Sequence, residues 1–126
     1  MIAKRILVID DEDDIREVAL LCLQTMGGWD AIAASSGNEG LAIASAELPD
    51  AILLDVMMPD MDGPTTFQQL QANPITAQIP VLLLTAKVQA AEQRRFAQSG
   101  VKAVLIKPFD PLTLATQIAQ ALGWNE

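Results

Sequence analysis

The sequence predicts an α/β domain built on a five-stranded parallel sheet with helices on both faces. Five short apolar runs lack the alternation of apolar and polar residues that marks a half-solvated strand, so they are typical of strands covered on both sides. The runs occupy positions 6–9, 31–34, 51–54, 81–84 and 104–106. Segments with helical spacing separate them, and this alternation favours a parallel sheet with right-handed crossovers. The alanine-rich run at 31–34 is the best candidate for an edge strand.

The first two helices are predicted from capping boxes, in which an N-cap side chain is followed three residues later by Glu or Gln. Asp14 with Glu17 predicts the start of the first helix, whose apolar residues recur at helical spacing until a glycine pair ends it. Ser36 with Glu39 predicts the start of the second helix.

Proline positions predict the third and fifth helices. Asp62, followed by Gly63 and Pro64, opens the third helix, and the dipeptide Asn73-Pro74 ends it. The fourth helix is predicted at about 89–98, before Gly100. Asp110 stands before a first-turn proline and predicts a fifth helix over about 112–122, which Gly123 closes.

Length and composition favour one domain in a reducing compartment. The chain has 126 residues, of which 51% are apolar and 19% charged, which suits a single core. No linker or second domain is indicated, so we expect residues 1–126 to form a single domain without an output domain. The start of the chain lacks a secretory segment, and its single cysteine cannot form an internal disulfide; both favour a cytoplasmic protein.

Charge and residue usage exclude several classes of function. Sixteen acidic residues against eight basic ones give a net charge of −8, which argues against a nucleic-acid-binding surface. The apolar runs are too short to span a membrane. The chain has no histidine, which excludes Ser-His-Asp and Cys-His catalysis, histidine-ligated zinc and a phosphohistidine carried by this chain itself.

Polar residues stand where the strongest predicted strands end. Asp10 and Asp11 follow the first run, Asp55 the third, Thr85 the fourth and Lys107 the fifth. Parallel strands end at the same edge of the sheet, where ligands bind in open α/β folds, so these side chains are expected to converge. Three neighbouring carboxylates favour a hard divalent cation such as magnesium, which keeps waters that phosphate oxygens can replace. A carboxylate beside a cation, an ammonium and a hydroxyl is a plausible nucleophile toward phosphorus.

With these residues in place, the sequence resembles the receiver domain of two-component response regulators, in particular the single-domain, chemotaxis-type receivers. The resemblance covers the whole chain and rests on four segments in order. These are residues 8–11 (VIDD), 53–59 (LLDVMMP) with 62–63 (DG), 84–86 (LTA) and 107–109 (KPF). The resemblance implies a flavodoxin-like sheet with strand order 2-1-3-4-5.

The resemblance also implies a role for each site residue. Asp55 corresponds to the phosphoacceptor, which makes the chain an autocatalytic phosphoacceptor rather than a turnover enzyme. Thr85 and Lys107 would bind phosphoryl oxygens, and the Lys107–Pro108 peptide is expected to be cis. The magnesium ligands implied in this way are Asp10, Asp11, Asp55 and the backbone carbonyl of Met57.

The sequence departs from the family pattern at Val104, where receivers commonly carry Tyr or Phe. In the family, that ring rotates inward when the hydroxyl at the position of Thr85 moves, so we expect a smaller or different conformational response here. Met57 and Lys87 correspond to the two variable positions that flank the phosphoryl group.

The implied function is a single-domain response regulator that accepts a phosphoryl group from a sensor histidine kinase or a histidine phosphotransfer protein. It would then signal by binding a downstream protein through the region from Gln89 to Leu122. An alternative is a pseudo-receiver that binds its partner without phosphorylation, and a phosphatase of the haloacid-dehalogenase type is disfavoured. Glu12, Asp13 and Asp14 are interpreted as a solvated helix start stabilised by the helix dipole.

Overall fold

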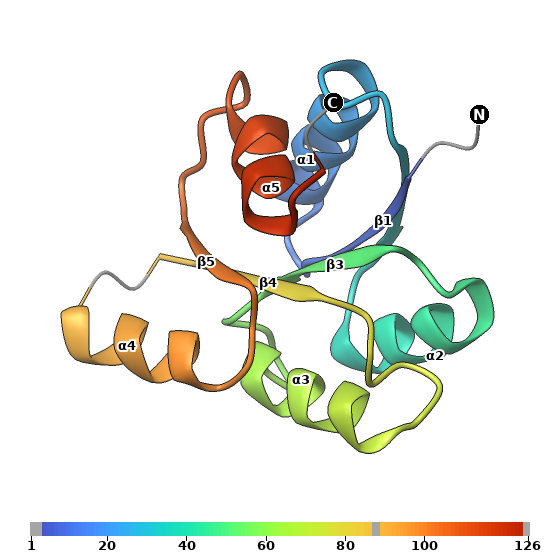
Figure 1. The fold of residues 1–126 in the computed structure, drawn as a ribbon, viewed down its shortest axis with the longest axis vertical. Coiled ribbons are helices and arrows are strands. Elements are labelled where there is room, and N and C mark those ends of the chain that lie inside the picture. Colours follow the sequence, from blue (N-terminus) through green and yellow to red (C-terminus); the bar gives the residue numbers. More distant parts are fainter. Residues whose placement is uncertain (1–3, 87–88, 125–126) are drawn as a thin grey trace.

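The computed structural model describes residues 4–86 and 89–124, in which five strands alternate with five helices (Figure 1). The strands are β1 Arg5–Ile9, β2 Asp30–Ala34, β3 Ala51–Asp55, β4 Val81–Thr85 and β5 Ala103–Ile106. The helices are α1 Asp13–Thr25, α2 Gly37–Glu47, α3 Gly63–Ala72, α4 Ala90–Gln98 and α5 Leu114–Leu122. The strands are parallel and lie in the order β2-β1-β3-β4-β5, so the predicted fold class and strand order are confirmed.

The central strands separate two hydrophobic cores. Alternate residues of one strand point to opposite faces, so Leu7 and Ile9 of β1 join one core while Ile6 and Val8 join the other. Every residue of β3 and β4 is buried. Burial on both faces explains why these strands read as continuous apolar runs.

Helices cover both faces of the sheet (Figure 1). α1 and α5 pack on one face, and α2, α3 and α4 lie on the other (Figure 1). α4 is the loosely packed member, because none of its nine residues is fully buried. A groove of about 570 Å³ lies between α3 and α4, with Phe67 and Phe96 in its lining.

Local capping signals place α2 and α3 as predicted. The Asp62 carboxylate accepts a hydrogen bond from the Thr65 N–H at 2.9 Å and opens α3. The Ser36 hydroxyl accepts one from the Glu39 N–H at 3.1 Å and opens α2. The Glu39 carboxylate turns back to the N–H and hydroxyl of Ser35, one residue earlier than a standard capping box requires.

The predicted start of α1 is wrong. The helix begins at Asp13 with Glu12 as its N-cap residue, so Asp14 lies in the first turn and does not cap it. The cause is Asp10, whose Oδ1 accepts the Glu12 N–H at 2.9 Å. Arg16 Nη1 in turn donates to the Asp10 carbonyl at 2.8 Å. These bonds fix the turn after β1, so the helix begins at a residue that precedes the predicted capping box.

The helix α5 begins at Leu114, two residues later than predicted. The Asp110 carboxylate accepts the Leu112 N–H at 2.9 Å, and its carbonyl accepts the N–H groups of Thr113 and Leu114 at 3.0 Å. Asp110 therefore stabilises a separate turn that precedes the helix.

Within the described residues, no helix has the length and apolar character needed to cross a membrane.

Candidate functional site

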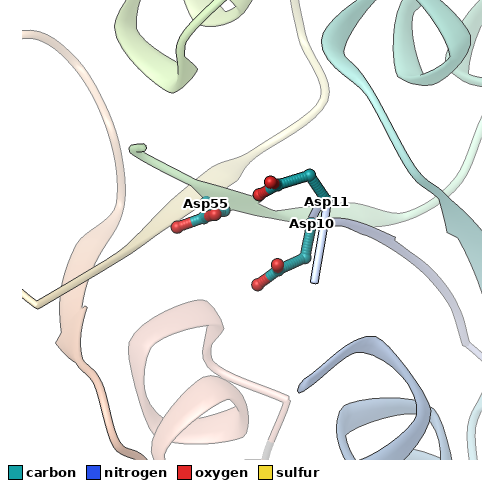
Figure 2. Close-up of side chains that lie close together, drawn as sticks. All are labelled: Asp10, Asp11 and Asp55. Atoms are coloured by element: carbon teal, nitrogen blue, oxygen red, sulfur yellow. The ribbon is translucent and has the colours of Figure 1, made fainter. Parts of the chain in front are cut away.

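Three carboxylates converge where β1 and β3 end. Asp10 and Asp11 directly follow β1, Asp55 is the last residue of β3, and the two strands are neighbours in the sheet. One carboxylate oxygen from each residue lies within 4.8 Å of the other two, and Figure 2 shows the three side chains extending to the same side of the strand ends. Asp10 and Asp55 are almost completely buried, and Asp11 is partly exposed. The predicted acidic cluster is therefore present.

Lys107 reaches this cluster from the loop after β5. Its ammonium Nζ lies 3.2 Å from Asp55 Oδ1, 3.1 Å from Asp10 Oδ2 and 2.9 Å from Glu12 Oε1. The Lys107 backbone N–H donates to the Thr85 carbonyl at 2.9 Å, which ties the loop to the end of β4. The Lys107–Pro108 peptide is cis, as the resemblance implies. The predicted meeting of ammonium and carboxylates is therefore confirmed.

The other two predicted site residues occupy the same edge of the sheet. Thr85 is the last residue of β4 and is fully buried. Met57 lies in the loop after β3, where the residue is 64% exposed and its backbone makes a hydrogen bond with Asp55. Lys87, expected to flank the site, lies outside the described residues.

The crowded charges shift the ionisation of the buried groups. Burial raises the pKa of Asp55 to about 6, and the nearby Asp10 charge adds to this rise against the opposing charge of Lys107. Burial also raises the pKa of Asp10. Burial alone would lower the pKa of Lys107, but hydrogen bonds to Glu12 and Asp10 and the charge of Asp55 outweigh it, so the pKa is raised. The lysine therefore remains an ammonium.

The donor set fits a magnesium ion. Asp10 Oδ2 is buried and has no hydrogen-bond partner in the part of the chain that the structure describes, although Lys107 Nζ makes an ion pair with it at 3.1 Å. A single ammonium does not compensate three carboxylates, and the charge of Asp10 adds to the rise that burial causes in the pKa of Asp55. Carboxylate oxygens are the ligands that magnesium prefers. Asp10, Asp11 and Asp55 would hold the ion.

Two residues that contact the site were missed at the sequence level. Glu12 was interpreted as part of a solvated helix start, but its carboxylate bonds Lys107, 95 positions away in the chain. Gly63 packs so closely against β3 that a Cβ atom there would lie 2.4 Å from the Asp55 carbonyl oxygen. The adjacency of Glu12 to the strand-end acids was the one available signal, whereas the close approach at Gly63 depends on the fold.

The comparisons with known proteins agree on one family. The family model described as the response regulator receiver domain matches residues 6–119. The chain is 42% identical over 106 residues to the DNA-binding dual master transcriptional regulator RpaA of Synechocystis, an alignment that covers 84% of this chain and 44% of that protein. It is 36% identical over 123 residues to the alkaline phosphatase synthesis transcriptional regulatory protein PhoP of Bacillus subtilis. That alignment covers 98% of this chain and 50% of PhoP. The chain thus spans about half the length of these curated relatives.

Solved structures give the same answer. The chemotaxis protein CheY4 of Vibrio cholerae superposes with a TM-score of 0.87 at 28% identity, over 94% of this chain and 98% of that chain. The N-terminal domain of a response regulator receiver protein from Methanoculleus marisnigri gives a TM-score of 0.76 at 38% identity, over 94% of this chain and 95% of that chain. The family match runs from β1 into α5 and includes every strand end that contributes to the acidic cluster. The chain therefore belongs to the response regulator receiver domains of two-component signalling.

Proposed function

We propose that this domain accepts a phosphoryl group on Asp55 from a phosphohistidine carried by a sensor histidine kinase or a histidine phosphotransfer protein. The observation that carries the proposal is the contact between Lys107 Nζ and buried Asp55 Oδ1 within a cluster of three carboxylates. An ammonium held there neutralises charge that arrives with a phosphoryl group. The donor is placed on another protein because this chain has no histidine.

The proposed transfer forms one bond and breaks one. A carboxylate oxygen of Asp55 attacks phosphorus, and the phosphorus–nitrogen bond of phosphohistidine breaks. The electron pair stays on the imidazole nitrogen, which takes up a proton, and Asp55 becomes an acyl phosphate. Each domain is modified once per transfer, so it acts as an autocatalytic phosphoacceptor and not as a turnover enzyme.

The surrounding residues have distinct tasks in this step. Lys107 binds one phosphoryl oxygen, and the Thr85 hydroxyl donates to another. Asp10, Asp11, Asp55 and the Met57 carbonyl would hold the magnesium ion, which supplies charge neutralisation for the attacking carboxylate and the phosphoryl oxygens. The chain's own contribution is to fix the carboxylate and the ammonium in contact before the donor arrives.

The phosphorylated domain is proposed to signal in the cytoplasm by binding another protein, and to act as a single domain. The region from Gln89 to Leu122 offers a suitable surface, because α4 has no fully buried residue and Leu112 is 71% exposed nearby. The net charge of −8 favours a protein partner over nucleic acid for this domain.

One measurement tests the phosphoacceptor. The protein is incubated with magnesium and acetyl phosphate, and its intact mass is recorded before and after treatment with base. We expect one base-labile phosphoryl group on the wild type and none on Asp55→Asn, while Asp50→Asn, an exposed aspartate before β3, still accepts it. A wild type that gains no phosphoryl group contradicts the proposal and favours a constitutive partner-binding pseudo-receiver.

A further inference from the structure

We propose that Glu12 is a positioning residue that competes with the incoming phosphoryl group for the Lys107 ammonium. This inference rests on the proposed function, because it assigns a role to Glu12 in the same transfer. The juxtaposition that carries it is the 2.9 Å contact between Glu12 Oε1 and Lys107 Nζ, because the same ammonium lies 3.2 Å from Asp55 Oδ1.

Three carboxylates surround the Lys107 ammonium, which donates a hydrogen bond to Glu12 and makes ion pairs with Asp10 and Asp55. Asp10, Glu12 and Asp55 each place one oxygen between 2.9 and 3.2 Å from Nζ. Their exposure differs sharply, because the side chains of Asp10 and Asp55 are 1% and 4% exposed and that of Glu12 is 60% exposed. Glu12 is therefore the one partner of the three that water can solvate when the contact breaks.

A phosphoryl group on Asp55 brings new oxygens next to an ammonium that three carboxylates already surround. A contact between Lys107 and a phosphoryl oxygen therefore competes with the contacts that the ammonium already makes. Breaking an ion pair with a buried carboxylate such as Asp10 is more costly than breaking one with an exposed carboxylate, which contributes little. Glu12 is the partner that is displaced.

The side chain of Glu12 is free to make this exchange without harm to the fold. It stands at the N-cap position of α1 but makes no capping hydrogen bond within the described residues. The turn it occupies is fixed by the bonds of Asp10 with the Glu12 N–H and with Arg16. In the resting domain Glu12 thus binds the ammonium and repels anionic donors. It lowers the affinity of the site for the phosphoryl group without a direct role in its transfer.

The test compares Glu12→Gln with Asp14→Asn, which removes the same charge from the exposed start of the same helix. Phosphorylation rates are measured by intact mass over a range of acetyl phosphate concentrations with magnesium. The dissociation constant of the phosphoryl mimic beryllium trifluoride is measured by calorimetry. We expect Glu12→Gln to lower both the half-saturating acetyl phosphate concentration and this constant by about two- to fivefold, with little change in the maximal rate.

A third variant separates the effect of the Glu12–Lys107 contact from the long-range effect of the Glu12 charge. Glu12→Asp keeps the charge but is too short by one methylene to hold the same contact, so we expect it to follow Glu12→Gln. The inference is overturned if Glu12→Gln behaves like the wild type, if Asp14→Asn gives an equal gain, or if Glu12→Asp keeps wild-type values. A wild type that takes no phosphoryl group from acetyl phosphate overturns the proposed function as well, which distinguishes the two failures.

Discussion

At the scale of single residues, the geometry of Asp55 depends on the absence of a side chain at Gly63. The Gly63 N–H donates to the Val56 carbonyl at 2.9 Å, which draws the start of α3 against the end of β3. A Cβ atom at position 63 would lie 2.4 Å from the Asp55 carbonyl oxygen and 2.8 Å from Val56 Cα. Both are backbone atoms at the end of β3 and in the residue that follows it, and they cannot rotate away, so a methyl group there has to push against the end of β3.

We therefore expect Gly63→Ala to lower the free energy of unfolding by about 1–3 kcal/mol and to weaken magnesium binding. The matched control is Gln69→Ala, an exposed position of the same helix, which should change stability by less than about 0.5 kcal/mol. Urea unfolding gives the stability, and calorimetric titration with magnesium gives the affinity. Equal stability of the two variants would show that the close approach imposes no constraint.

The same scale shows how far the site can be predicted from the sequence. Asp10, Asp55 and Lys107 are predictable because each stands at the end of an apolar run, and parallel strands end at one edge. The contacts of Glu12 and Gly63 are not predictable in this way. The first depends on where a long lysine side chain rests, and the second on the distance between two backbone segments after folding.

At the scale of secondary-structure elements, boundaries set by local sequence signals can be predicted from the sequence, whereas boundaries set by tertiary contacts cannot. The strands are evident because burial on both faces demands continuous apolar residues. The starts of α2 and α3 are evident because Ser36 and Asp62 bond backbone groups three residues away. The start of α1 is not, because Asp10 and Arg16 close the preceding turn before Asp14 can act as a cap. The strand order comes from the family resemblance and not from any local pattern.

The element scale also bears on the response to phosphorylation. Val104 of β5 is partly buried against the core that includes Leu83 and Val81, and Phe96 of α4 packs against the same core. A β-branched side chain is stiff about χ1, so Val104 cannot reproduce the rotation of an aromatic ring. α4 has no fully buried residue, which leaves this helix as the element best able to shift.

We therefore expect beryllium trifluoride, added with magnesium, to leave the χ1 rotamer of Val104 unchanged while amide signals of α4 move. Methyl and amide NMR spectra with three-bond coupling constants provide the measurement. Val101, a buried valine just before β5, serves as the internal reference for methyl groups of this core. A change of the Val104 rotamer on binding would contradict this expectation.

At the scale of the whole molecule, the buried carboxylates of the acidic cluster make stability depend on pH. Asp55 has a pKa of about 6 in the folded chain, against an ordinary value of 3.8. Between these two values the folded state binds the proton more tightly than the unfolded state does. The free energy of unfolding therefore falls as pH rises through this window, and above it Asp55 costs the metal-free fold about 3 kcal/mol. The raised pKa of Asp10 acts in the same direction.

Two consequences can be measured by urea unfolding followed through the fluorescence of Trp29 and Trp124. In EDTA, we expect the wild type to lose about 2 kcal/mol relative to Asp55→Asn between about pH 4.5 and about pH 7.5. Magnesium binds ionised carboxylates, so it should stabilise the wild type more at the higher pH than at the lower. A wild type that gains stability over Asp55→Asn as pH rises in EDTA, or equal stabilisation by magnesium at both pH values, would mean that ionisation of the buried Asp55 does not govern the stability of this domain.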